Sequence, residues 1–288
     1  MTGSLNDEQL RALSERLVYL RNLEEKKASV LATIKEQGKL TDELKKQIEA
    51  VMTMVALEDL YRPYRPKRRT RATIAKEKGL EPLAEILRAQ ATTRTIEEEA
   101  TAFVDAEKGV ESVQDAIDGA KDILAEVYAD DADYRTKLRA MTKESGSLVA
   151  KAKDEEADSV YEMYYDFSEP IKKLVGHRIL AINRGEAEKF LTVKIEAPRQ
   201  EILLWLVKQI IGNMKHDSAS YLYEAITDSY DRLIAPSIER EIRNELTEKA
   251  EEGAIGVFGK NLHQLLMQPP ISGQVVLGWD PGFAHGSK

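Results

Sequence analysis

Leucines in the first part of the chain recur every three or four residues, the spacing that places side chains on one face of a helix. The first stripe comprises Leu10, Leu13, Leu17, Leu20 and Leu23. It predicts a helix from Asn6 or Asp7 to about residue 27, followed by a shorter one at 29–36 and another that Thr41 caps. A narrow stripe of this kind is typical of a helical hairpin or coiled-coil seam, so these leucines are expected in a core.

The same periodicity predicts helices along most of the remaining chain. They are expected at residues 72–78, from Pro82, from Thr95 to about 104, at 113–129, at 134–141, from Pro198, at 218–233 and at 237–267. The last would be about 45 Å long. Alternating polar and apolar residues favour short strands at 148–152 and 190–195. The predicted fold class is therefore mainly α, a multi-helix N-terminal and central region with a small β element.

The C-terminal segment has a different pattern. Residues 274–278 are nearly all apolar and precede the turn sequence Trp279-Asp280-Pro281-Gly282, which favours a buried strand followed by a tight turn. One strand cannot form a sheet, so it is expected to be the first strand of a truncated domain. We predict a division into residues 1–145, 146–270 and 271–288.

Composition limits the possible chemistry. The 288 residues include no cysteine and four histidines, which excludes disulfides and thiolate metal sites and leaves little for a zinc or iron centre. We expect no cofactor, no bound metal and no catalytic residue. The N-terminus lacks the features of a signal peptide, and no apolar run approaches 18 residues. The expectation is a soluble, cytoplasmic protein without membrane contact.

The charge is unevenly distributed. The whole chain carries −8, whereas residues 61–78 carry +7, which leaves −15 for the rest. Pro63 and Pro66 forbid a regular helix here and predict an extended, exposed strap. Its cations can neutralise phosphates, and its two tyrosines can stack on bases. The predicted nucleic-acid-binding residues are Tyr61, Arg62, Tyr64, Arg65, Lys67, Arg68, Arg69 and Arg71.

A structural role for the strap is an open alternative. The prolines and tyrosines can pack it onto the helices while the arginines pair with carboxylates of the acidic remainder. Both interpretations can hold for different residues, with Tyr61 and Pro63 as anchors and residues 67–71 as the exposed face.

Three segments carry a family resemblance. Residues 57–87 (LEDLYRPYRPKRRTRATIAKEKGLEPLAEIL), 177–186 (HRILAINRGE) and 276–282 (VLGWDPG) resemble, in the same order, stretches of the bacterial Tex family of transcription accessory proteins. The resemblance covers essentially the whole chain but part of the family protein. It implies nucleic-acid binding, RNA or DNA, a role in transcription, and contacts with transcription or translation machinery and with downstream domains of the full-length protein.

The resemblance also implies that the C-terminal strand begins a YqgF-like domain of RNase H fold. Asp280 matches the first-strand carboxylate that helps to hold Mg²⁺ in that fold. The partner carboxylates would lie beyond Lys288, so we expect no nuclease activity from this polypeptide.

Two further motifs have ordinary structural explanations. Residues 73–90 show the helix, glycine turn and helix of a helix-turn-helix, but the second helix offers Arg88 as its one cation, which favours an ordinary helical corner. His177, Arg178, Asn183, Arg184 and Glu186 look catalytic at first sight, yet a tight turn before a strand is the favoured interpretation. The competing hypothesis for the whole chain is a helical scaffold or protein-interaction region, with nucleic acid bound by the missing C-terminal domains.

Overall fold

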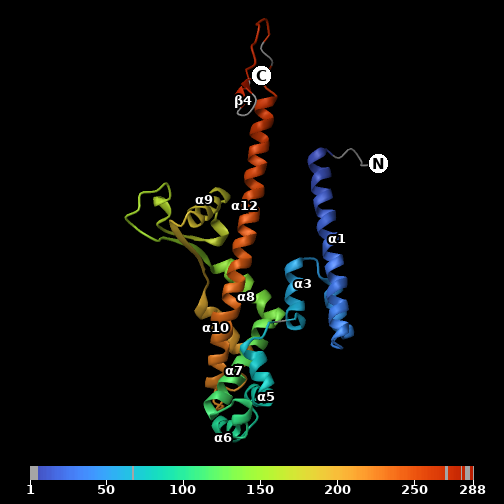
Figure 1. Cartoon of the computed structure of the whole chain (residues 1–288), viewed down its shortest axis with the longest axis vertical. Coiled ribbons are helices and arrows are strands. Elements are labelled where there is room, and N and C mark those ends of the chain that lie inside the picture. The colour runs from blue at the N-terminus through green and yellow to red at the C-terminus, as the bar shows by residue number, and fades with distance from the viewer. Residues whose placement is uncertain (1–5, 67, 270–271, 280, 283–285, 288) are drawn as a thin grey trace.

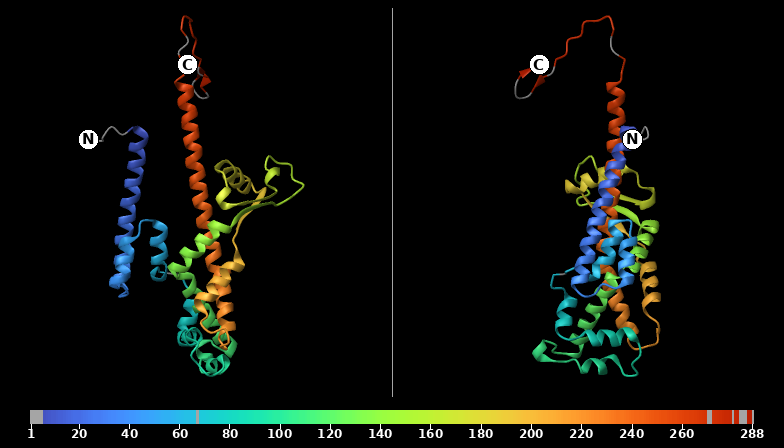
Figure 2. Two further views of the ribbon diagram at one scale, coloured as in Figure 1. Left: turned by 180° about the vertical axis from the view of Figure 1, so that it is seen from behind. Right: turned by 90° about the vertical axis from the view of Figure 1, so that its right-hand side faces the viewer.

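The computed structural model of the chain is mainly α-helical with one small three-stranded antiparallel sheet, which confirms the predicted fold class. It describes residues 6–66, 68–269, 272–279, 281–282 and 286–287. The molecule is elongated. Helix α12 (Ala235–Leu266) lies along its long axis, the N-terminal helices stand on one side of α12, and the sheet lies on the other side (Figure 1, Figure 2).

The first three helices form an N-terminal hairpin with a hydrophobic cluster of its own. The helices are α1 (Asp7–Glu36), α2 (Asp42–Ala50) and α3 (Met54–Tyr61). The cluster consists of Leu23, Val30, Ile34, Leu44, Ile48 and Leu57. The predicted break before Ser29 is wrong, because no proline or glycine interrupts α1 there. Leu13 and Leu17 are 57% and 45% exposed, so the first part of the leucine stripe is not in the core.

The other helices build a helical body around α7. They are α4 (Arg71–Glu77), α5 (Glu81–Ala89), α6 (Ile96–Thr101), α7 (Val113–Asp130), α8 (Ala132–Ser145), α10 (Arg199–Ile210) and α11 (Ala219–Asp228), with the π-helix η5 (Ser229–Ile234) leading into α12. Helix α7 packs against α4, α5, α6 and α11. Gly119 allows this close approach, since a Cβ there would lie 2.3 Å from Leu80 Cδ1.

Local capping signals are confirmed where the sequence shows them. The Thr95 side chain accepts a hydrogen bond from the Glu98 N–H at 3.3 Å, and the Glu98 carboxylate accepts one from the Thr95 N–H at 3.2 Å. This reciprocal pair satisfies two otherwise unpaired donors at the start of α6. Gly79 ends α4 with a φ of +82°, a left-handed conformation that glycine adopts without steric cost.

The sheet has the order β2-β1-β3 with antiparallel neighbours. Strands β1 (Ser147–Ala152) and β3 (Leu191–Glu196) confirm the predicted strands. Strand β2 (Asp166–Pro170) was not predicted, because Phe167 is its one large apolar side chain. The predicted tight turn at residues 176–186 is wrong, since Gly176–Ala187 forms helix α9. Ile179 and Ile182, three residues apart, are buried on the packed face of α9.

Helix α12 is buried in its first half and exposed in its second. Ile238, Ile242 and Ala250 are buried, whereas Phe258 and Leu265 are 68% and 62% exposed. The helix continues through its glycines, and none of the described helices combines the length and apolar content needed to cross a bilayer. The predicted strand at 274–278 is wrong: no neighbouring strand pairs with these residues within the described ranges. Asp280 lies outside the described residues.

Candidate nucleic-acid interface

Residues 61–71, hereafter the basic strap, connect the N-terminal hairpin to the helical body. Helix α3 ends at Tyr61 because Pro63 has no N–H to continue the helical hydrogen bonds. A single 3₁₀ turn, η1 (Arg62–Tyr64), follows. The described residues between η1 and Thr70 are irregular, and Thr70 caps α4, where the Thr70 Oγ1 accepts from the Thr73 N–H at 3.1 Å. Lys67 lies outside the described residues. The predicted interruption of the helix at the prolines is therefore confirmed, although its first part is a 3₁₀ turn rather than extended.

The two tyrosines of the strap are partly buried against the N-terminal hairpin. Both Tyr61 and Tyr64 pack on the hydrophobic cluster of α1–α3. The Gln37 Nε2 donates to the Tyr64 carbonyl oxygen at 2.8 Å and ties the strap to the end of α1. These contacts favour an anchoring role for the two rings over stacking on bases.

Arg62 points into the interface between the hairpin and the body. Its Nη2 donates to Ser237 Oγ at 3.3 Å. Burial and the nearby charge of Arg135 lower the pKa of Arg62 below its usual value. The protonated guanidinium is thus disfavoured by its surroundings and partly shielded from solvent, which suits an internal contact better than a phosphate contact.

The remaining described arginines of the strap are exposed. Arg65 lies 3.9 Å from Glu58, and Arg69 lies 2.8 Å from Glu77, with side-chain exposures of 66% and 69% for the two arginines. Arg68 and Arg71 are exposed as well. Ion pairs at such exposed positions contribute at most about 1 kcal/mol, so a phosphate can replace these carboxylate partners at little cost.

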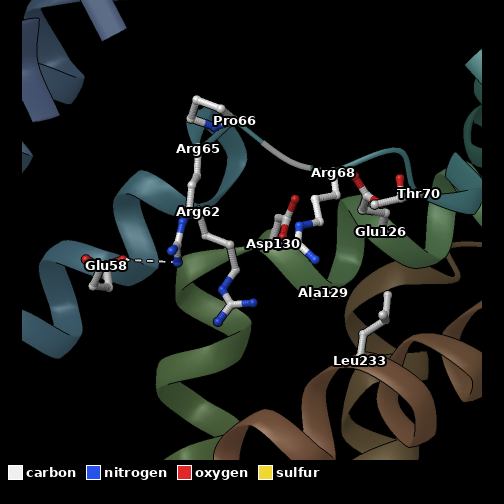
Figure 3. Close-up of a pocket in the computed structure, with 10 residues that line it drawn as sticks. All are labelled: Glu58, Arg62, Arg65, Pro66, Arg68, Thr70, Glu126, Ala129, Asp130 and Leu233. Carbon is white, nitrogen blue, oxygen red and sulfur yellow. Dashed lines mark ion pairs between the residues drawn. The ribbon is translucent and has the colours of Figure 1, made fainter. Parts of the chain in front are cut away.

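A pocket of about 370 Å³ lies beneath the strap, between η1 and α7 (Figure 3). Three arginines and three carboxylates line it, namely Arg62, Arg65 and Arg68, and Glu58, Glu126 and Asp130. Figure 3 shows the Arg68 side chain reaching over α7 toward Asp130. Among the described residues that line the pocket the formal charges balance, so they do not by themselves concentrate phosphate, and the exposed arginines of the strap provide the cationic surface.

Arg71 lies at the end of the strap beside acidic residues of the body. It lines a pocket with Asp118, Asp122 and Asp228. Burial raises the pKa of Asp122, while the charges of Arg232 and Arg71 act in the opposite direction. Arg71 therefore partly neutralises local carboxylates while its own side chain stays exposed.

A buried charge cluster behind the strap was not singled out by the sequence. The Arg135 Nε donates to Asp59 Oδ1 at 2.7 Å, and its Nη2 donates to Glu241 Oε1 at 2.5 Å. Arg139 bonds the second oxygen of each carboxylate, at 2.8 and 2.9 Å. Burial disfavours the charge of Glu241, but the hydrogen bond and charges of Arg139 and Arg135 outweigh it and lower the pKa of Glu241. The hydrogen-bonded partners in this cluster lie 76 to 106 positions apart in sequence, so no local pattern reveals them.

The segment with helix-turn-helix spacing packs as an ordinary corner. Leu83, Ala84 and Leu87 of α5 are buried toward the body, and Arg88 pairs with Glu85 at 3.3 Å on the outer surface. A helix that reads DNA normally presents several hydrogen-bond donors to base edges. The outer surface of α5 does not favour that role. Within the described ranges, no group of three or more His, Cys, Asp and Glu side chains is arranged to hold a metal ion.

The chain is similar along its whole length to parts of several longer proteins. The Tex central region-like family matches residues 91–258. YdcI of Bacillus subtilis (strain 168) is 47% identical over 100% of this chain and 40% of its own length. The transcriptional accessory protein Tex of Neisseria gonorrhoeae is 39% identical over 100% and 38%. S1 RNA-binding domain-containing protein 1 of Homo sapiens is 32% identical over 100% and 30%. The chain thus spans two fifths or less of the length of these relatives.

Proposed function

Because this chain belongs to the Tex central region-like family, we propose that it is a nucleic-acid-associated region of a Tex-like transcription accessory protein. Its phosphate contacts come from the solvent-facing arginines of the basic strap, Arg65, Arg68, Arg69 and Arg71. The names of two relatives support this class of role, since one is a transcriptional accessory protein and another contains an S1 RNA-binding domain.

The observation that carries the proposal is the exposure of four arginines close together in sequence, of which Arg71 begins α4 and the others precede it. Each phosphate that an arginine neutralises releases condensed counterions, and this release drives binding without regard to sequence. Arg65 and Arg69 give up weak, exposed ion pairs in exchange. The strap therefore combines accessible charge with a low cost of changing partners.

We further propose that the strap acts without catalysis. Arginine stays protonated in proteins and does not exchange protons near neutral pH, so these side chains bind and orient anions rather than serve as general acids or bases. RNA and DNA both present the phosphates that such a surface recognises.

A second candidate function is a helical scaffold for protein contacts, with nucleic acid bound by other parts of a longer protein. The exposed apolar side chains on the second half of α12 favour it, because exposed apolar surface of this extent is typical of interaction sites. The balanced charges in the pocket beneath the strap point the same way.

Oligonucleotide binding at two salt concentrations distinguishes the two functions. Fluorescence anisotropy with labelled single- and double-stranded RNA and DNA is measured for the wild type and for Arg68→Ala/Arg69→Ala/Arg71→Ala. The strap proposal predicts weaker binding and a log–log salt slope that falls by about 2 for single strands, since each lost phosphate contact contributes roughly 0.7.

The matched control removes three exposed lysines near the sheet, in the variant Lys172→Ala/Lys173→Ala/Lys189→Ala. It changes the net charge by the same amount, so it reports the general effect of charge. Equal binding by the strap variant and the wild type would favour the scaffold. Equal losses in both triple variants would show attraction that does not depend on the strap.

A further inference from the structure

Within the part of the chain that the structure describes, no strand pairs with the outer edge of β2, which leaves its main-chain groups open to another strand. The Ala152 N–H donates to the Tyr165 carbonyl and the Ile171 N–H to the Gly146 carbonyl, both at about the normal distance, 2.9 and 3.0 Å. In this register Phe167 and Glu169 exchange hydrogen bonds with β1. The alternate residues, Asp166 and Ser168, therefore direct their N–H and C=O groups away from the sheet.

The opposite edge of the sheet is closed by α12. On β3 the outward N–H of Ile195 donates to Glu239 Oε1 at 3.0 Å, and the outward carbonyl of Val193 accepts from Arg243 Nη1 at 3.4 Å. No comparable hydrogen bond reaches the outward groups of Asp166 or Ser168 within the described part of the chain. Both residues are exposed, and β2 packs mainly on β1 and the short helix η3 (Glu162–Tyr164).

The surroundings of the β2 edge are acidic and partly apolar. Residues 151–166 contain six carboxylates and two lysines, a net charge of −4, whereas two further exposed lysines, Lys172 and Lys173, follow β2. In the same segment Val160 and Met163 are 85% and 73% exposed. This segment forms the yellow-green loop that extends away from α12 on the side opposite the N-terminal hairpin (Figure 1). It thus offers apolar contacts and negative charge next to the free edge.

We propose that the β2 edge binds an extended, basic segment of a partner protein by strand addition. The main-chain groups of Asp166 and Ser168 pair with the added strand, as in other cases in which a peptide extends a sheet. Side chains alternate along that strand, so one set contacts Val160 or Met163 while the other places cations beside the carboxylates. The net negative charge selects a basic partner segment and disfavours nucleic acid.

A proline at one end of β2 limits the pairing of another strand with this edge. Pro170 occupies an outward position, where its missing N–H costs no hydrogen bond to β1. It limits the added strand to the part of β2 that precedes it. Because β2 is five residues long, the site fits a short segment and a reversible contact rather than a permanent one.

A backbone-specific pair of variants tests the proposal in the full chain. The probe is a fluorescein-labelled nine-residue peptide of alternating lysine and valine, measured by anisotropy at low ionic strength. Ser168→Pro removes an outward N–H without removing a bond to β1, and Ser168→Ala keeps that N–H. We expect Ser168→Pro to weaken binding about tenfold or more and Ser168→Ala to stay within about twofold of the wild type.

Two peptide controls make the test independent of variant folding. Both are measured with the wild-type protein. One control is a peptide with glutamate in place of lysine. The other is the lysine–valine peptide in two methylated forms, each with alternate backbone nitrogens methylated along one of its two edges. Strand addition predicts no binding of the acidic peptide and loss of binding for one of the two methylated forms. Absence of binding by the original probe, equal binding of both methylated forms, or unchanged binding by a folded Ser168→Pro protein would overturn the proposal. Self-association of the wild type that Ser168→Pro abolishes would also overturn it, because it assigns the edge to a second copy.

Discussion

Two groups of arginines in this protein form ion pairs of similar length and have different roles. Arg135 in α8 is completely buried and lies 2.7 Å from Asp59. Arg69 in the basic strap lies 2.8 Å from Glu77, yet its side chain is 69% exposed. Burial makes the difference, because a buried charge that loses its partner stays desolvated whereas an exposed one is rehydrated. The distance within an ion pair therefore does not reveal its role.

The buried arginines connect two parts with separate hydrophobic clusters. Among the described residues, the N-terminal hairpin and the helical body each enclose their own cluster. Between them, Asp59 of α3 faces Arg135 and Arg139 of α8, and both arginines reach Glu241 of α12. Charge and hydrogen bonding thus fix the position of the hairpin, and with it the start of the strap.

The largest expected effect is that of Arg135→Ala. It leaves Asp59 and Glu241 with one arginine in place of two in a desolvated site, and we expect the free energy of unfolding to fall by about 3–5 kcal/mol. Chemical denaturation measures the change. Lys137→Ala, at an exposed position on the same helix, is the control and should lie within about 0.5 kcal/mol of the wild type. Similar stability of the two variants would remove the distinction between the buried and exposed arginines.

The next effect is loss of stability in acid. The pKa of Glu241 in the folded protein lies below its usual value of 4.5. Its ionisation therefore contributes stability that is fully present above about pH 4.5 and is lost as the pH falls through the lower, folded-state pKa. Denaturation midpoints measured from neutral pH to pH 3 should decline less for Glu241→Gln than for the wild type. Parallel declines would show that Glu241 does not couple folding to protons.

A smaller effect is expected for Arg62→Gln. This variant tests whether Arg62 belongs with the buried arginines or with the exposed arginines of the strap. The substitution loses the hydrogen bond to Ser237 but relieves the repulsion with Arg135 that helps to lower the pKa of Arg62. The opposing contributions predict a change in unfolding free energy below about 1 kcal/mol, of either sign. Oligonucleotide affinity should also be unchanged. A large loss of affinity would place Arg62 in the phosphate-binding surface after all.

The smallest effect on stability is expected for Arg69→Ala. Its exposed pair with Glu77 predicts a change in unfolding free energy within about 0.5 kcal/mol. Oligonucleotide affinity should fall measurably in the same variant, because a phosphate contact is lost. A stability loss as large as that of Arg135→Ala would show that the strap arginines are structural.

Local patterns predicted the secondary structure well where one stretch of chain contains all the necessary interactions. The capping box at Thr95 and the glycine at the end of α4 act over three or four residues, and both are confirmed. Local patterns failed where a residue distant in sequence determines the local structure or its exposure. Strand β2 has little apolar character of its own and exists because β1 offers a partner, and Leu13 is exposed because α2 and α3 do not extend along the first part of α1.

The candidate site shows the same division. The run of cations, its prolines and its capping threonine are properties of consecutive residues, so the sequence by itself determined a basic strap that interrupts the α-helices. Which of its arginines face solvent depended on the approach of α8 and α12, which partly bury Arg62 beside Ser237 and leave Arg69 exposed. Backbone propensity and net charge act locally, whereas desolvation depends on every atom that surrounds a group. The sequence therefore determined where the charge lies, and tertiary structure decided which charges are available to a partner.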